Sequence, residues 1–229
     1  MANLDFDSDS GKDLSTDWVT DPPIRQLKAG EVKTCCDWLA DAIDDWAVTD
    51  KSNGSPVPKE YDEIRALWNK RIGDGVARAA VIALADQSDK LDRDVYAYFY
   101  SGKPVGMMSI DADETGKRKA VYVEELVAHP GARNAGDLLV EHAVRLSDAA
   151  GFGGVVELLA LAGAHDFYKS LGFERADSKS RWSGLVPARL TPSSPQWQKL
   201  LGKWTLTALW QVRSANPTLE AIPTEAFRN

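Results

Sequence analysis

The sequence predicts a mixed α/β fold, with a central mixed sheet and helices on both of its faces. Three patterns lead to this prediction. Apolar residues with helical spacing come first, over residues 31–72. Three strand-like runs then follow one another between residues 95 and 128, joined by polar turns. Beyond residue 128 helix and strand alternate, and adjacent strands combined with strand–helix–strand units favour a mixed sheet between helices.

The first 21 residues differ in composition from the rest of the chain. Residues 1–21 are rich in Asp and Ser, lack the apolar segment of a secretory signal, and are expected to form a flexible acidic tail. Residues 22–229 show no internal repeat and no linker, and are expected to form a single domain. A chain of 229 residues with 44% hydrophobic and 27% charged residues can bury a sizeable core.

The elements are assigned from apolar spacing and from β-branched and aromatic runs bounded by turn residues. Gly73 and Gly75 are expected to end the second helix, and residues 76–85 fit helix or strand. The run 155–161 is continuously apolar, which is typical of a strand buried on both faces. In chain order, the predicted elements are a strand at 24–27, helices at 31–46 and 61–72, strands at 95–100, 105–110 and 120–128, a helix at 137–150, a strand at 155–161, a helix at 164–170, a strand at 179–185, a helix at 196–201 and a strand at 204–212.

Charge and cysteine content limit the classes of partner. A net charge of -7 does not attract nucleic acid, so no nucleic-acid partner is expected. No run approaches the apolar length of a membrane span, so no membrane partner is expected. Cys35 and Cys36 are adjacent, which suits buried thiols in a reducing compartment, and a cytoplasmic location is expected. The three histidines lack zinc-type spacing, and no metal is expected.

The segment from Val121 to Val144 carries the most information about function. A buried strand ends at Ala128, a loop of small residues follows, and a helix begins near Asp137. A helix N-terminus offers unpaired backbone N–H groups and a partial positive charge, and small residues let a phosphate approach them closely. The segment therefore predicts a site for a pyrophosphate.

A second motif follows about thirty residues later, directly after the strand at 155–161. It reads F-Y-x-x-L-G-F, with Phe167, Tyr168, Leu171, Gly172 and Phe173. Together, the two segments resemble the GNAT superfamily of N-acetyltransferases over roughly residues 95–175. The resemblance implies a GNAT-like central mixed, mostly antiparallel sheet with helices on both faces. It also implies acetyl-CoA as co-substrate, no metal, and transfer of the acetyl group to an amine.

The phosphate loop departs from the family's pattern, Arg/Gln-x-x-Gly-x-Gly/Ala. Counted back from the helix, Gly136 takes the second glycine position, Asn134 the first and Gly131 the Arg/Gln position. Counted forward from Pro130, Arg133 takes the Arg/Gln position instead, and both alignments stay open. Asn at a glycine position is compatible with the pattern, because Asn adopts left-handed backbone more readily than most residues.

The resemblance assigns backbone groups to the co-substrate. Leu126, Val127 and Ala128 would bind the pantetheine arm and the acetyl carbonyl, because their strand parts from its neighbour there. Asp137 could also cap the helix. The residues that would hold the pyrophosphate are Arg133, Asn134, Ala135, Gly136, Asp137 and Leu138.

The resemblance also implies the groups that move protons. Tyr168 corresponds to the general acid that protonates the leaving thiolate, and the alternative is an aromatic that packs the core. A carboxylate would take the amine's proton, and the candidates are Glu124, Glu125 and Glu157. Strand alternation puts Glu124 and Glu125 on opposite faces, so we expect at least one to face the substrate. Each could instead be solvated or ion-paired, and His129 could take a proton or simply belong to the loop.

Three functions remain open on the sequence. The first is an acetyl-CoA-dependent N-acetyltransferase that uses direct transfer in a ternary complex. The second is a catalytically inactive GNAT-fold module that senses CoA or binds a protein, and the altered loop motivates it. The third is an unrelated α/β protein with chance matches. The acceptor, a small molecule or a protein amine, is not fixed by the sequence; an acidic surface could favour a cation such as a polyamine, and the resemblance allows a homodimer.

Overall fold

A computed structural model describes residues 23–28, 30–44, 59–86, 93–112, 119–176, 184–193, 195–209 and 211. The acidic tail expected at residues 1–21 lies outside the described residues. So does the end of the first predicted helix, after residue 44.

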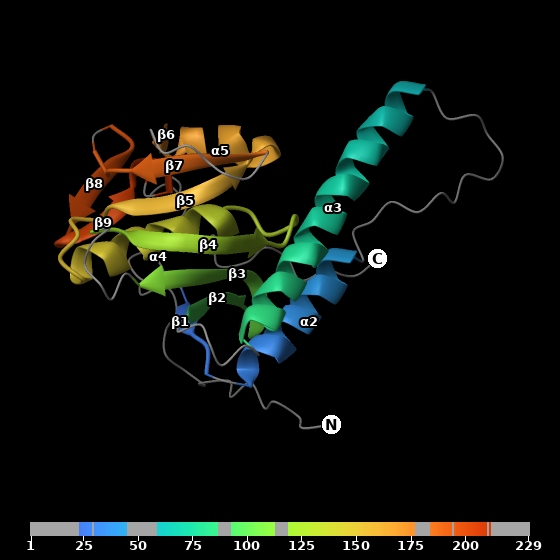
Figure 1. The fold of residues 1–229 in the computed structure, drawn as a ribbon, viewed down its shortest axis with the longest axis horizontal. Helices are drawn as coiled ribbons and strands as arrows, with labels where there is room; N and C mark the ends of the chain where they lie inside the picture. Colours follow the sequence, from blue (N-terminus) through green and yellow to red (C-terminus); the bar gives the residue numbers. More distant parts are fainter. Residues whose placement is uncertain are drawn as a thin grey trace.

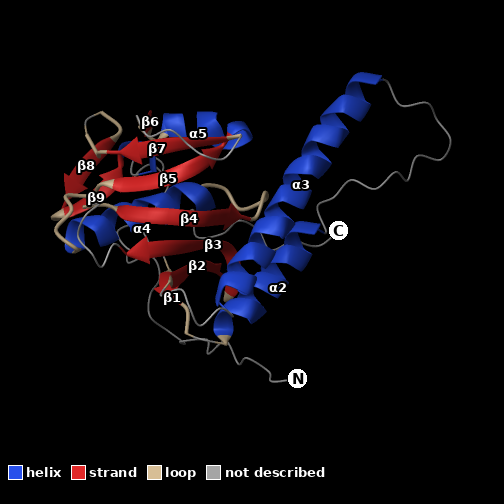
Figure 2. Ribbon diagram, in the orientation of Figure 1, coloured by secondary structure: helices blue, strands red, loops and turns tan. Residues whose placement is uncertain are grey.

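Seven strands form the central sheet (Figure 2). Their order is β1-β2-β3-β4-β5-β7-β6, and every neighbouring pair is antiparallel except β4 and β5, which are parallel. The mixed, mostly antiparallel sheet that the sequence predicts is therefore confirmed. The strands are β1 (Ile24–Gln26), β2 (Asp94–Tyr100), β3 (Lys103–Ala112), β4 (Val121–Ala128), β5 (Val156–Leu161), β6 (Glu174–Arg175) and β7 (Leu185–Leu190).

Helices cover both faces of this sheet, as predicted (Figure 1). The helices are α2 (Glu31–Asp44), α3 (Lys59–Asp86), α4 (Ala135–Ala149) and α5 (His165–Ser170). On one face, α2 and α3 bury a cluster that includes Met107 of β3 and Val127 of β4. On the other face, α4 buries a cluster that includes the neighbouring strand residues Met108 and Val123. On β3, the adjacent residues Met107 and Met108 thus belong to different cores, as strand alternation requires.

Helix α3 is longer than the sequence predicts. Instead of ending at Gly73 and Gly75, one helix runs without a break from Lys59 to Asp86, and its N-terminal part extends beyond the sheet (Figure 1). A glycine costs a helix interior about 1 kcal/mol relative to alanine. Burial of side chains further along the helix outweighs that cost, which local sequence alone does not reveal. These buried side chains are Ile72, Ala79, Ile82 and Ala83.

Replacing Gly73 with alanine should stabilise the protein by about 0.8–1 kcal/mol. Among the described residues, no atom lies within 4 Å of a Cβ added there, so alanine gains helix propensity without a clash. Urea denaturation measures the change. Gly154→Ala is the opposing control and should destabilise, because its φ is +87° and the added Cβ would lie 2.7 Å from Pro192. A loss of stability in Gly73→Ala would contradict a continuous α3.

The C-terminal part differs from the prediction. Residues 196–201, expected to be helical, contain β8 (Trp197–Leu200), which pairs with β9 (Lys203–Leu206) in a separate two-stranded sheet. Leu201 and Gly202 join them with φ values of 50° and 80°, as a tight hairpin turn requires. Leucine rarely adopts that backbone conformation, so the turn is hidden in the sequence.

Two further strand predictions change. Of the strand expected at 179–185, residues 179–183 lie outside the described residues, and β7 begins at Leu185. The strand expected at 204–212 ends at Leu206. Strand β5 is fully buried on one face only, through Val156, Leu158 and Ala160. The cluster that α2 and α3 bury on the other face draws its strand residues from β2, β3 and β4. Among the described helices, none is both long and apolar enough to cross a membrane.

Candidate active site

The parallel strands β4 and β5 separate partway along their length. Their ladder ends at the pair Val123–Leu158, whereas β4 continues to Ala128 in register with β3. Residues 124–128 of β4 and 159–161 of β5 therefore face each other without pairing, and we call this region the splay. It lies where the resemblance places the acyl-pantetheine arm.

Backbone groups of β4 point toward the splay at alternate residues. The N–H of His129 donates to the carbonyl of Val105 on β3 at 2.9 Å, and Val127 lies two residues earlier in the same ladder. In an antiparallel ladder, hydrogen-bonded pairs alternate with pairs whose N–H and C=O groups point away from the partner strand. Leu126 and Ala128 thus direct their N–H groups toward the splay, while Val127 directs its own toward β3.

A β-bulge interrupts β4 at the edge of the splay. On β3, Ser109 is paired with Glu125, and the next residue, Ile110, is paired with Val123. Glu124 is therefore an extra residue on β4, and it shifts the alternation of side chains by one position. This shift means that Glu124 and Glu125 need not point to opposite faces of the sheet.

Packing and charge contacts show that both glutamates lie on the face covered by α2 and α3. The Glu125 carboxylate forms an ion pair with the guanidinium of Arg78 from α3. Glu124 Oε2 lies 2.6 Å from Arg93 Nε, and Arg93 is two residues before Val95, which packs on the same side as α2 and α3. The prediction that Glu124 and Glu125 lie on opposite faces is therefore wrong, and the bulge is the reason.

The environment of Glu125 suits a base. Burial raises the pKa of Glu125 above its ordinary value, and the ion pair with Arg78 and the charge of Arg93 oppose this effect. A carboxylate with a raised pKa holds a proton more firmly than an exposed glutamate, which favours proton abstraction from an amine.

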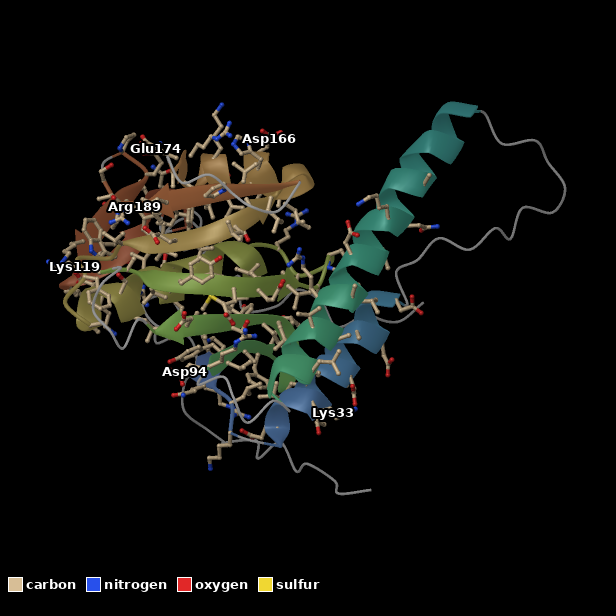
Figure 3. The ribbon with its side chains drawn as sticks, viewed as in Figure 1. Lys33, Asp94, Lys119, Asp166, Glu174 and Arg189 are labelled. Carbon is tan, nitrogen blue, oxygen red and sulfur yellow. The ribbon has the colours of Figure 1, made fainter. Side chains whose placement is uncertain are left out.

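Glu157 lies outside this cluster. Glu157 lies on β5 and is paired with Tyr122 of β4, before the splay begins. Its carboxylate forms an ion pair with Arg189 of β7. Figure 3 shows Arg189 on the part of the sheet away from α3. At about 3.3 Å per strand residue, Glu157 and Glu125 are separated by roughly 7–10 Å along the sheet. The structure brings two of the three candidate bases together and separates the third.

Tyr168 of α5 lies within electrostatic range of Glu125. Its ring packs against Phe167 and Phe173, with ring centroids 5.0 and 5.4 Å away. Burial raises the pKa of Tyr168 to about 12, the charge of Arg78 lowers it, and that of Glu125 raises it. Side chains from α5, α3 and β4 are therefore close enough to influence one another. The raised pKa keeps the phenol protonated at neutral pH, as a general acid requires.

Helix α4 begins next to the end of β4, two residues earlier than predicted. Its N-cap is Asn134, whose φ of 61° is the left-handed conformation that makes Asn compatible with a glycine position. The first helical bond runs from the N–H of Leu138 to the carbonyl of Asn134 at 2.9 Å. The N–H groups of Gly136 and Asp137 precede this bond and point out of the helix end.

The side chains of this turn take different positions. Asp137 is the third helical residue and does not cap the helix, which corrects the prediction that it could. Burial raises the pKa of Asp137, and the nearby Glu141 adds to the shift. Arg133 is exposed, whereas Ala135 and Leu138 are buried in the core.

Gly136 joins the two sequence motifs. A Cβ added at Gly136 would lie 3.0 Å from the ring of Phe167 on α5, so the absence of a side chain allows the close contact. Phe167 in turn packs on Tyr168. Through Phe167, the start of α4 thus packs against α5, the helix that carries the candidate acid Tyr168.

Comparison with known proteins agrees with this geometry. The family model described as acetyltransferase (GNAT) family matches residues 61–173, a range that includes both motifs and most of α3. This chain carries a GNAT-family acetyltransferase domain. The resemblance inferred from the two motifs is thus confirmed, and it extends upstream of residue 95. No curated protein matches the chain.

Solved structures give the GNAT domain several distant neighbours. The PaiA N-acetyltransferase of Thermoplasma acidophilum, in complex with coenzyme A, is 17% identical with a TM-score of 0.43, covering 72% of this chain and 96% of that one. A structure titled histone acetyltransferase HPA2 and related acetyltransferase, from Corynebacterium glutamicum, is 18% identical with a TM-score of 0.40, covering 76% and 98%. At these values the likeness carries no information about an acceptor.

Sequence reasoning missed the cationic half of the GNAT domain's site. Arg78 lies in the segment left open between helix and strand, Arg93 immediately precedes β2, and Arg189 lies on β7, with no motif around the last two. Ser109 was also missed; it is 1% exposed, sits opposite Glu125, and its hydroxyl has no hydrogen-bond partner among the described residues. The one signal in the sequence was the pair of glutamates in the otherwise apolar strand 121–128, which indicates that cationic partners lie nearby.

His129 holds the loop of the GNAT domain in place. It is 2% exposed, its Nδ1 accepts the N–H of Gly131 at 3.1 Å, and its Nε2 lies 3.1 Å from the carbonyl of Ala42 on α2. An Nδ1 that accepts leaves the proton on Nε2, which then donates to Ala42. Burial lowers the pKa of His129, so the neutral ring is favoured. These contacts support the loop role rather than a catalytic one.

Acidification should destabilise the GNAT domain through His129. Because its pKa is lower when folded, the unfolded chain binds the proton more tightly, and the stabilisation is complete above the ordinary pKa of 6.5 and is lost as the pH falls below it. His129→Gln should remove part of this slope, which for one group is at most about 1.4 kcal/mol per pH unit. Urea denaturation between about pH 7.5 and 5 measures it. His165→Gln, at a half-exposed position, is the control; equal slopes in wild type and His129→Gln would contradict the assignment.

Proposed function

We propose that the protein transfers an acetyl group from acetyl-CoA to an amine, directly, in a ternary complex of enzyme and both substrates. The observation that carries this proposal is the splay: β4 leaves β5 after Val123, Glu125 lies on the free part of β4, and Tyr168 lies on α5, the helix that follows β5. The pKa of the Glu125 carboxylate is raised, the Tyr168 phenol is protonated, and two backbone N–H groups of β4 point toward the splay. Amine acylation needs a base, an acid and a donor for the carbonyl oxygen, and this site offers each.

The backbone fits acetyl-CoA in two places. Leu126 and Ala128 direct N–H groups into the splay, and one of them would polarise the thioester carbonyl. Gly136 and Asp137 offer N–H groups at the start of α4, where the positive end of the helix dipole would hold the pyrophosphate. When bound, acetyl-CoA supplies an activated acyl carbon and a thiolate leaving group.

The chain's own side chains then account for the protons. Glu125 takes a proton from the acceptor's ammonium and releases it to solvent, so that the free amine can attack. Tyr168 donates its hydroxyl proton to the sulfur as the C–S bond breaks and the C–N bond forms. The second proton lost by the nitrogen restores the phenol, which leaves an amide, a thiol and one proton in solution. Glu124 and Glu157 are the alternative bases.

Substitution of the three glutamates tests this assignment. Glu125→Gln should lower kcat/KM by about 100-fold or more, the usual contribution of a general base, and should remove the acidic limb of the pH profile. Glu157→Gln should retain most of the activity because Glu157 lies before the splay. The assay follows free thiol released from acetyl-CoA with a panel of amines. A larger loss in Glu124→Gln or Glu157→Gln than in Glu125→Gln would transfer the base role to that residue.

The same assay separates this function from its alternative. An inactive module would bind CoA, as measured by calorimetry, and would release no thiol with any amine. Absence of CoA binding would contradict both functions.

A further inference from the structure

Each glutamate that could serve as base is already paired with an arginine. Two of these pairs, Glu125–Arg78 and Glu124–Arg93, lie together on the face covered by α2 and α3. Their side chains are only 19–28% exposed, so water neutralises little of their charge. Although the whole chain has a net charge of -7, each of these two carboxylates is matched by a guanidinium.

This balance limits which amines can reach Glu125. An acceptor arrives as an ammonium ion and must compete with Arg78 for the carboxylate. A simple cation would then leave a half-buried guanidinium without a counter-charge, which is costly. An amine that carries its own carboxylate avoids that cost, since its ammonium pairs with Glu125 while its carboxylate pairs with Arg78. The planar guanidinium is well suited to grip a carboxylate through two hydrogen bonds.

We propose that the acceptor is a zwitterion of the α-amino acid class, and that Arg78 determines this specificity by binding the acceptor's carboxylate next to Glu125. This inference rests on the proposed acetyltransferase function. It replaces the expectation from overall charge, in which the acidic surface would favour a polycation such as a polyamine.

The position of Arg78 is built into the packing of α3. Gly75 lies one helical turn before Arg78, and a Cβ added at Gly75 would lie 3.4 Å from Ile43 and 4.0 Å from Val127. This part of α3 therefore lies at van der Waals distance from Ile43 of α2 and from Val127 of β4, two residues beyond Glu125. The ion pair holds Arg78 over Glu125, and the charges of both residues act on the hydroxyl of Tyr168.

Paired acceptors test the proposal. The twenty standard amino acids are compared, each with its own amide, which keeps the amine and side chain but removes the carboxylate charge. An amide's amine is the less basic of the two and is more often unprotonated, so any preference for the acid must come from its carboxylate. We expect kcat/KM for the best amino acid to exceed that for its amide by about tenfold or more, the factor that one charge-assisted contact of about 1.4 kcal/mol provides.

Variants at Arg78 supply the second half of the test. Arg78→Met should abolish the preference for the acid over the amide, while Arg78→Lys should keep part of it. Arg25→Met is the matched control, because Arg25 also pairs with a glutamate, Glu31, at the exposed start of α2, and its removal should leave the preference unchanged. Thermal unfolding checks that each variant is folded.

The outcomes are distinct. Equal or better turnover of the amides by the wild type would overturn the zwitterion proposal and leave the acetyltransferase function standing. An unchanged preference in folded Arg78→Met, or an equal loss on acid and amide, would overturn the role of Arg78. Absence of turnover on every member of the panel and on polyamines would overturn the proposed function, and this inference with it.

Discussion

Tyr168→Phe should lower kcat by about 10²–10⁴-fold, the usual contribution of a general acid or base, and leave the fold intact. Phenylalanine keeps the ring that packs against Phe167 and Phe173 and removes only the hydroxyl. The leaving thiolate then has no positioned proton donor, whereas the contacts proposed for acetyl-CoA come from the backbone of β4 and α4. The loss should therefore fall on kcat, with KM for acetyl-CoA little changed, and steady-state kinetics with thiol detection measures both.

Tyr96→Phe is the matched control for this experiment. Burial raises the pKa of Tyr96 to about 12, as it does for Tyr168, but Tyr96 lies on β2 and packs on the ring of His142, 4.9 Å between centroids. Its substitution should leave kcat near the wild-type value. If both variants lose activity to the same degree, the effect of Tyr168 comes from burial of a phenol in the core and not from proton transfer.

The location of the site could be predicted from sequence because its main parts are local. A strand, a loop of small residues and the start of a helix occupy consecutive residues, and the F-Y-x-x-L-G-F motif places Tyr168 on the next helix. The left-handed conformation of Asn134 also follows from residue type alone. Such features depend on backbone preferences within a few residues, which a single sequence records.

The face presented by Glu124 could not be predicted, because the bulge depends on pairing with another strand. The chain advances two residues on β4, from Val123 to Glu125, while β3 advances one, from Ile110 to Ser109. No residue type within 121–128 marks Glu124 as the extra residue. The partners of the glutamates are equally remote, since Arg78 is 47 residues before Glu125. Pairs of this kind are set by tertiary packing, and the inference about the acceptor depends on them.

The errors in secondary structure have the same origin. Two glycines are strong local signals for the end of a helix, yet α3 continues through them because its later turns are buried against α2 and the sheet. The β8–β9 hairpin was hidden by a leucine in a left-handed turn. In both cases packing at a distance overrides a local preference of about 1 kcal/mol.

A buried charge in α4 shows how such packing also secures the C-terminal hairpin. Glu141 is completely buried; its Oε1 lies 2.7 Å from Arg145, and its Oε2 accepts the N–H of Leu206 on β9 at 2.8 Å. Arg145 donates to the carbonyl of Trp204 at 2.9 Å. The pair thus ties α4, whose first turn is proposed to hold the pyrophosphate, to the small second sheet. A buried pair of this kind is costly to break because the remaining charge stays buried.

Glu141→Gln should therefore reduce the free energy of unfolding by about 3 kcal/mol, the typical cost of leaving one partner of a buried pair uncompensated. Glutamine can still accept from Leu206, so the loss reports on the charge facing Arg145, which is 12% exposed. Urea denaturation measures the change, and Glu174→Gln, at an exposed position on β6, is the surface control. Glu141→Met combined with Arg145→Met should recover part of the stability, since removing both charges is less costly than removing one. A Glu141→Gln protein as stable as the wild type would show that the hairpin is held by apolar contacts and not by this pair.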